Sequence, residues 1–158
     1  ITMGGAGKTP AVDWITTVLK QEGIQPAVLT RGYRRRHAAR HVVVPAGHSA
    51  PQDLTGDEAQ ILLRRGNAHI GVGADRHTVG MLVEERLHPG VFVLDDGFQH
   101  VQLARDLDLV LIDALDPFGR GELFPKGRLR EPLETLALAD ALLITRADSG
   151  RPLDVIVE

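Results

Sequence analysis

The sequence predicts an α/β fold in which a mostly parallel sheet carries helices on both faces. Short apolar runs alternate with segments of helical period along the chain, and this alternation is typical of parallel sheets. A glycine-rich turn stands directly before the first helical segment, and two apolar runs end on aspartate. Because ligands of such sheets bind beyond the carboxyl ends of the strands, we expect the functional residues to gather there.

The composition is that of an ordinary globular protein. The 158 residues, 43% of them hydrophobic and 25% charged, suffice for one domain with a buried core. A net charge of −3 argues against a general nucleic-acid binder, so no nucleic-acid partner is expected. The absence of cysteine excludes disulfides and thiolate metal sites. No apolar run is long enough to span a bilayer.

Six short runs rich in branched apolar residues are expected to be strands. They cover residues 26–30, 42–44, 68–72, 91–94, 107–113 and 141–145, and 91–94 is expected to be the clearest buried strand. Helical period and capping residues predict helices over 10–22, 56–65, 74–87 and 133–138. The stretches 45–55 and 116–132 are expected to be loops.

The first stretch of the chain has the residues of a phosphate-binding loop, Thr2-Met3-Gly4-Gly5-Ala6-Gly7-Lys8-Thr9. Glycines let successive backbone N–H groups turn toward one anion. Lys8 offers a charge for the β- and γ-phosphates of a nucleotide, and Thr9 offers a hydroxyl for Mg²⁺. Thr2 stands where the general motif has glycine. The sequence therefore predicts a P-loop NTPase-like fold whose first strand is truncated, since at most residues 1–3 could belong to that strand.

Two carboxylates follow the strand predicted at 91–94. Phosphoryl transfer needs Mg²⁺ between the β- and γ-phosphate oxygens, and a loop hydroxyl with a strand-end carboxylate can hold it. Thr9, Asp95 and Asp96 are therefore the candidate metal residues, with Asp96 also a candidate catalytic residue beside Lys8. The alternative is that Asp95-Asp96-Gly97 is only a turn, because these residues favour turns.

Asp57 is the candidate acceptor of a hydroxyl proton, because a kinase acting on an alcohol requires a carboxylate near that group. Asp57 could equally be a helix N-cap, a position that aspartate favours. The basic stretch 31–41 is either a solvated loop or an anion site. By composition alone, Arg76, Arg130 and Glu131 would more often be surface charges, and His100 would more often be structural.

Several motifs together resemble the tetraacyldisaccharide 4′-kinases, the lipid A 4′-kinases of Gram-negative bacteria. They are the glycine-rich loop, Thr30-Arg31-Gly32-Tyr33, Gly56-Asp57-Glu58, Gly73-Ala74-Asp75-Arg76, Asp95-Asp96-Gly97-Phe98-Gln99-His100 and Leu129-Arg130-Glu131-Pro132. The resemblance covers nearly the whole chain, and the Asp-Asp-Gly-Phe-Gln-His block is its most specific part. It implies that residues 1–158 are the P-loop kinase domain, without the family's N-terminal membrane segment and C-terminal lid domain.

The resemblance implies a kinase that uses ATP and Mg²⁺ to phosphorylate the 4′-hydroxyl of tetraacyldisaccharide 1-phosphate, giving lipid IVA. It also implies work at a membrane surface, the cytoplasmic face of the bacterial inner membrane, without a protein partner. Residues 2–9 would bind ATP, Asp57 would be the catalytic base, and Asp95 and Asp96 would serve the metal. The supporting residues would be Arg31, Tyr33, Arg76, His100, Arg130 and Glu131.

Other functions of the same fold remain open on the residues alone. One is another small-molecule kinase. A second is a nucleotide-dependent ATPase or GTPase switch, for which Thr145-Arg146-Ala147-Asp148 stands where a base-recognising Asn-Lys-x-Asp would be expected, without its Asn and Lys. A third, a remnant without catalysis, is disfavoured by the intact Lys8, Thr9 and Asp57.

Overall fold

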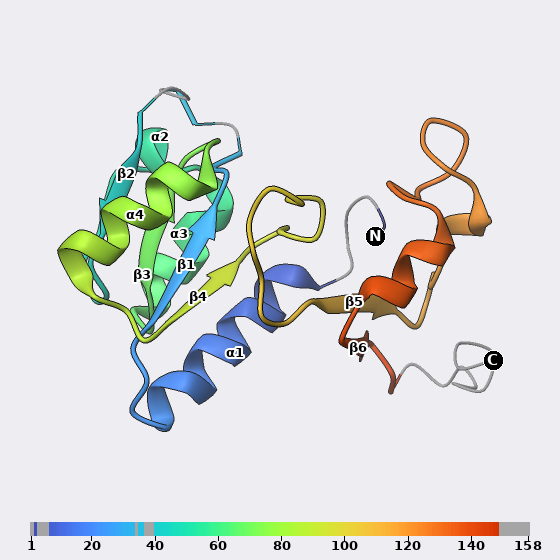
Figure 1. Ribbon diagram of the computed structural model, residues 1–158, viewed down its shortest axis with the longest axis horizontal. Coiled ribbons are helices and arrows are strands. Elements are labelled where there is room, and N and C mark those ends of the chain that lie inside the picture. Colours follow the sequence, from blue (N-terminus) through green and yellow to red (C-terminus); the bar gives the residue numbers. More distant parts are fainter. Residues whose placement is uncertain (1, 3–6, 34, 37–39, 149–158) are drawn as a thin grey trace. The chain divides into compact units, whose positions relative to one another are not determined.

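A computed structural model describes residues 2, 7–33, 35–36 and 40–148 (Figure 1). The chain forms two compact units. One unit is Thr9–Gly97, and the other comprises Ile1–Lys8 and Phe98–Glu158. Among the described residues, no helix has the length and apolar character that crossing a membrane requires.

The unit Thr9–Gly97 is built on a four-stranded sheet of order β2-β3-β1-β4. The central strand β1 (Pro26–Thr30) pairs in parallel with β3 (His69–Val72) and with β4 (Val91–Leu94). Strand β2 (Val42–Val44) runs antiparallel to β3. The parallel strands therefore place three loops at one edge of the sheet, where the predicted functional residues follow β1, β3 and β4.

Helices cover both faces of this sheet, as predicted: α4 (Arg76–Leu87) lies in front of the strands in Figure 1 and α3 (Asp57–Arg65) lies behind them. Alternate residues of β1 supply the two cores. Val28 packs in a buried cluster that includes Leu62 of α3, whereas Ala27 and Leu29 pack with residues of α4. The two other helices described up to Gly97 are α1 (Lys8–Gln21) and α2 (Gln52–Thr55).

The approach of α4 to the sheet depends on a glycine in β3. A Cβ atom at Gly71 would lie 2.7 Å from side-chain carbons of Leu29 and Val79 and 3.0 Å from one of Val83. Such distances are shorter than carbon–carbon contacts in packed interiors allow. Glycine at this position therefore lets the helix that carries Arg76 lie close against β1 and β3.

In the second unit, β5 (Leu109–Asp113) and β6 (Ala141–Thr145) form a parallel two-stranded sheet. Two short 3₁₀ helices, η1 (Gly119–Gly121) and η2 (Leu133–Leu138), lie in the connection between them. Thr2, buried at 7% exposure, forms an isolated antiparallel bridge with Leu129.

The predicted α/β class is confirmed, and several details of the predicted elements are wrong. The first helix begins at Lys8 rather than Pro10, and α2 occupies part of the expected loop 45–55 after its cap, Pro51. Strand β4 is half-buried rather than the clearest buried strand, because it is the edge strand of its sheet. Strand β5 begins two residues later than expected, at Leu109, and the backbone N–H of the preceding Asp108 donates to the Asp140 side chain instead of to a strand.

Candidate functional site

The loop after β1 is held against the end of β3 and the end of α2. Gly32 has φ of 72°, and a Cβ atom there would overlap the Val72 side chain and lie 3.0 Å from the backbone oxygen of Thr55. Glycine is the residue that tolerates this backbone and this proximity. The loop consequently keeps Arg31 and Tyr33 exposed on either side of a buried glycine.

The same loop packs against the start of α3, where Asp57 lies. Gly56 is the N-cap of α3, with φ of 83° and ψ of 170°, and a Cβ atom there would lie 2.5 Å from the Tyr33 carbonyl oxygen. Asp57 is therefore the first helical residue and not the cap. Its carboxylate is exposed and accepts a hydrogen bond of 2.5 Å from Gln52 Nε2. The fold thus brings the sequence motifs of residues 30–33 and 56–58 together.

The two carboxylates after β4 have different environments. Asp95 is buried at 6% exposure, and its Oδ2 accepts a hydrogen bond of 3.3 Å from Thr30 Oγ1 at the end of β1. Asp96 is exposed and has φ of 56°, in the left-handed region. Non-glycine residues in that region cluster at functional sites. The turn therefore holds one carboxylate against the sheet and turns the other to solvent.

Arg76 is buried at 4% exposure at the start of α4, so its assignment to the surface by composition is wrong. One guanidinium nitrogen, Nη1, donates to the carbonyl oxygens of Gly73 at 2.5 Å and Ala74 at 3.2 Å. Its Nε atom is buried and has no hydrogen-bond partner among the described residues. A buried donor without a partner is costly, and it indicates a position where a ligand oxygen could bind.

Electrostatics place Arg76 in one cluster with the carboxylates. Burial, and then the charge of Arg31, lower the pKa of the Arg76 guanidinium, and the charges of Asp95 and Asp96 oppose this change. Arg76 therefore interacts with two other arginines, Arg31 and Arg35, and with two carboxylates at the carboxyl edge of the sheet. Such an arrangement can bind a phosphate through the cations and a divalent cation through the carboxylates.

Two residues of this region were missed as individual candidates. Thr30 was expected only as the last strand residue, yet its hydroxyl fixes the Asp95 carboxylate. Arg35 was treated as part of a basic stretch, yet it is buried at 8% exposure and donates to Arg40 O at 2.5 Å. The position of Thr30, a polar residue at the carboxyl end of a predicted buried strand, is the signal that could have identified it as a site residue. Of the same basic stretch, Arg34 and His37 lie outside the described residues.

In the other unit, the described end of the glycine-rich loop lies against β6. Gly7 has φ of 77°, and a Cβ atom there would lie 3.4 Å from Thr145 Cγ2. Helix α1 begins at the next residue, Lys8, so the helix amino terminus follows the loop directly as predicted. Arg146 donates from Nε to Asp113 Oδ1 at 2.8 Å, and a second contact between their side chains makes the pair bidentate. Met3, Gly4, Gly5 and Ala6 lie outside the described residues.

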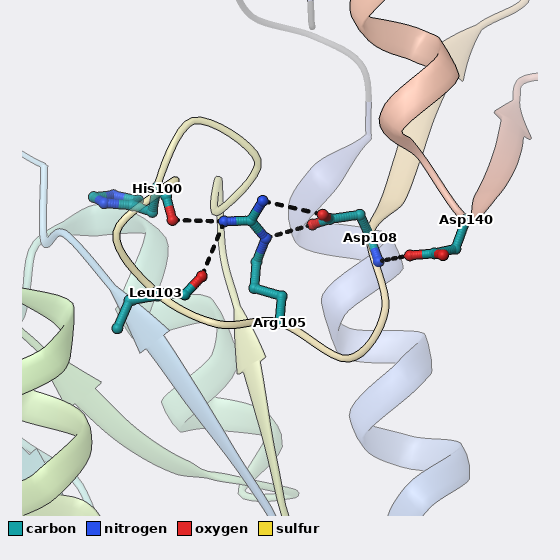
Figure 2. Close-up of polar contacts among 5 residues, drawn as sticks. All are labelled: His100, Leu103, Arg105, Asp108 and Asp140. Carbon is teal, nitrogen blue, oxygen red and sulfur yellow. Dashed lines mark hydrogen bonds and ion pairs between the residues drawn. The ribbon is translucent and has the colours of Figure 1, made fainter.

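The remaining predicted residues of this unit lie on two turns. His100 is half-buried, and its carbonyl oxygen accepts hydrogen bonds from Leu103 N at 3.1 Å and from Arg105 Nη1 at 2.5 Å (Figure 2). Arg130 is exposed and Glu131 half-buried, next to the buried Leu129.

The predicted residues are divided between the two units. The unit Thr9–Gly97 contains the clustered Arg31, Tyr33, Asp57, Arg76, Asp95 and Asp96, together with Thr9. The other unit contains Thr2, Gly7, Lys8, His100, Arg130 and Glu131. Among the described residues, no group of three or more His, Cys, Asp or Glu side chains could hold a metal ion by itself.

The chain is similar in sequence to known proteins. A curated tetraacyldisaccharide 4′-kinase of Chlorobium phaeovibrioides is 39% identical over 163 aligned residues, which cover 99% of this chain and 46% of the relative. Another from Syntrophotalea carbinolica is 42% identical, over 92% of this chain and 42% of the relative. The chain thus spans less than half the length of these relatives.

A solved structure extends the similarity to the fold. The crystal structure of LpxK from Aquifex aeolicus in complex with ATP is 35% identical in sequence and superposes with a TM-score of 0.86. The match covers 95% of this chain and 47% of that one. The profile of the LpxK family, tetraacyldisaccharide-1-P 4′-kinase, matches residues 1–155. The chain therefore belongs to the tetraacyldisaccharide-1-P 4′-kinase family.

Proposed function

We propose that the protein transfers the γ-phosphoryl group of ATP to the 4′-hydroxyl of tetraacyldisaccharide 1-phosphate. One observation carries the proposal beyond family membership. Arg76, buried with an Nε–H that has no hydrogen-bond partner in the part of the chain that the structure describes, interacts electrostatically with Arg31, Asp95 and Asp96 at the carboxyl edge of the sheet. Phosphoryl transfer is catalysed almost entirely by positioning and by compensating charge of this kind.

Residues 2–9 would bind the nucleotide phosphates. The left-handed Gly7 followed at once by the amino terminus of α1 supports this role, because free backbone N–H groups and the helix dipole favour an anion there. Lys8 would neutralise charge that develops on the transferring group. The related Aquifex aeolicus protein was solved in complex with ATP.

The donor set fits Mg²⁺ bound together with nucleotide. Magnesium in such sites takes one or two carboxylates or hydroxyls from the protein and completes its shell with phosphate oxygens and water. Thr9 with Asp95 or Asp96 would supply those donors. The ion would neutralise charge on the phosphates. Asp95 is buried and held by Thr30, whereas Asp96 is exposed to solvent.

Asp57 would accept the proton of the attacking hydroxyl. As the 4′-oxygen bonds to the γ-phosphorus, the bond from that phosphorus to the β–γ bridging oxygen breaks, and ADP leaves with the bonding electrons. The proton passes to the Asp57 carboxylate. Its exposed position on the first turn of α3 and its orientation by Gln52 support this role.

The acceptor places the reaction at a lipid surface. A tetraacylated disaccharide resides in a bilayer, so we propose that the protein works at the cytoplasmic face of the bacterial inner membrane, without a protein partner. The binding of the phosphates or the sugar would be supported by the remaining candidate residues, which are Arg31, Tyr33, His100, Arg130 and Glu131.

Transfer of label tests the proposed reaction. The complete protein would be incubated with Mg²⁺, γ-labelled ATP and the tetraacyldisaccharide 1-phosphate in detergent. Label at the 4′ position of the lipid is the expected result. Bound ATP without labelled lipid would refute the assigned acceptor and direct the search to other alcohols.

Substitution of Asp57 tests the assigned base, with its neighbour Glu58 as a matched control. Asp57→Ala should lower kcat by about 10²-fold or more with little change in ATP affinity, as expected for a group that acts in the transition state. Glu58→Ala, also exposed on the first turn of α3, should keep most activity. Equal losses in the two variants, or a parallel loss of ATP binding in Asp57→Ala, would contradict the assignment.

A further inference from the structure

Arg105 joins the turn that carries His100 to the beginning of the two-stranded sheet. Its guanidinium forms a fork with Asp108, from Nε to Oδ1 at 2.6 Å and from Nη2 to Oδ2 at 3.0 Å (Figure 2). Its third nitrogen, Nη1, donates to the carbonyl oxygens of His100 at 2.5 Å and Leu103 at 3.4 Å. All three guanidinium nitrogens therefore have partners within residues 100–108.

The partner carboxylate is itself fixed to the sheet. Asp108 lies immediately before β5, and its backbone N–H donates to Asp140 Oδ2 at 2.7 Å. In return the backbone N–H of Asp140, immediately before β6, donates to the Asp108 carbonyl oxygen at 2.9 Å. The starts of β5 and β6 are thus joined by reciprocal hydrogen bonds, and the Arg105 guanidinium connects them to the His100 carbonyl.

This ion pair differs from an ordinary surface salt bridge. The side chains of Arg105 and Asp108 are 17% and 18% exposed, so water screens them only in part. Bidentate, charge-assisted hydrogen bonds define geometry as well as supplying energy. The hydrogen bond with Asp108 also raises the pKa of Arg105, which keeps the guanidinium charged.

Figure 2 shows that the His100 ring points away from the guanidinium while its carbonyl points toward it. Arg105 therefore holds this residue through its backbone carbonyl and not through its ring. We propose that Arg105, backed by Asp108, is a positioning residue that orients the His100 side chain for the phosphoryl-transfer reaction. The inference rests on the proposed kinase function and extends it to a residue outside the motifs that indicated that function.

A double-mutant cycle with the labelled-lipid assay tests whether Arg105 acts through His100. In the complete protein, Arg105→Ala and His100→Ala should each lower kcat/KM by about tenfold or more. The kcat/KM of the double variant should lie within about threefold of that of the less active single variant, because both substitutions would then disturb the same group. Arg105→Lys should recover only part of the activity, because a lysine keeps the charge but not the fork. Arg86→Ala, an exposed arginine on the last turn of α4, is the control and should match the wild type.

Hydrogen exchange supplies a readout that does not depend on turnover. Amides of residues 98–108 should exchange faster in Arg105→Ala than in the wild type, with the rest of the chain unchanged, and Arg86→Ala should show no such effect. A loss spread over the whole chain would mean general destabilisation and would overturn the inference. So would multiplicative losses in the double variant, or unchanged exchange of the turn. If the wild type itself transfers no label, the proposed function fails and this inference fails with it.

Discussion

Gly56→Ala tests whether the fold holds the loop after β1 against the start of α3. The native φ of 83° with ψ of 170° belongs to a region occupied essentially by glycine, and a side chain there costs about 1–3 kcal/mol. The new Cβ would also lie 2.5 Å from Tyr33 O and 3.0 Å from Gly32 C. These are backbone atoms, which cannot rotate away as a side chain can, so displacement of the loop adds about 1–3 kcal/mol.

Gly23→Ala is the matched control for that substitution. Gly23 has a similar φ of 78°, but a Cβ atom there would meet nothing within 4 Å. Its cost is therefore conformational only, about 1 kcal/mol, which for a chain of this size lowers the melting temperature by about 2–4 °C. The same conversion gives about 4–24 °C for Gly56→Ala from the summed cost of about 2–6 kcal/mol.

Thermal unfolding followed by circular dichroism measures the melting temperatures of both variants. The labelled-lipid assay measures their turnover, which depends on the position of Asp57. Gly56→Ala should lose turnover more than ATP affinity, because the displaced element carries the proposed base. Gly23→Ala should keep its activity. Equal melting temperatures in the two variants would refute the close packing of Gly56 on the Tyr33 backbone.

Three further predictions concern single side chains. Burial lowers the pKa of His69, whose Nδ1 also accepts a hydrogen bond of 2.9 Å from Ala46 N, so the unfolded chain binds more protons. The free energy of unfolding should therefore rise with pH up to about 6.5, and His69→Gln should flatten that rise in urea titrations at several pH values. Thr30→Val should lower the free energy of unfolding by about 1–3 kcal/mol by removing a partner of buried Asp95, and Thr30→Ser by less in the same titrations. Asp96→Asn should lower kcat by about 10²-fold while changing the melting temperature little, because asparagine also tolerates the left-handed backbone.

Each of these has an outcome that would contradict it. A pH dependence that persists in His69→Gln would assign the titration to other groups. Equal stability of the valine and serine variants would mean that the Thr30 hydroxyl contributes nothing to holding Asp95. Full activity of Asp96→Asn would remove that carboxylate from the proposed metal and catalytic set.

Local residues determined much of the fold before any contact was known. Strands 26–30, 42–44 and 141–145 have the predicted bounds, because glycine, proline and charged residues limit each apolar run. The start of α3 next to Gly56 and the glycine that precedes α1 were also apparent, since turns and helix termini depend on residues a few positions apart. The same local chemistry identified the aspartates after β4 as candidates.

Burial and pairing were decided only by the tertiary structure. The sequence could not show that Arg76 is buried, because the residues that interact with it follow β1 and β4, far away along the chain. It could not show that β2 runs antiparallel, since direction depends on the partner strand. Strand β4 has the residues of a buried strand but lies at the edge of its sheet. The periodicity of apolar residues along the sequence determines whether a segment can form a helix or a strand. The neighbours of that segment in the folded protein determine which charged side chains are removed from water, and therefore which residues can form the active site.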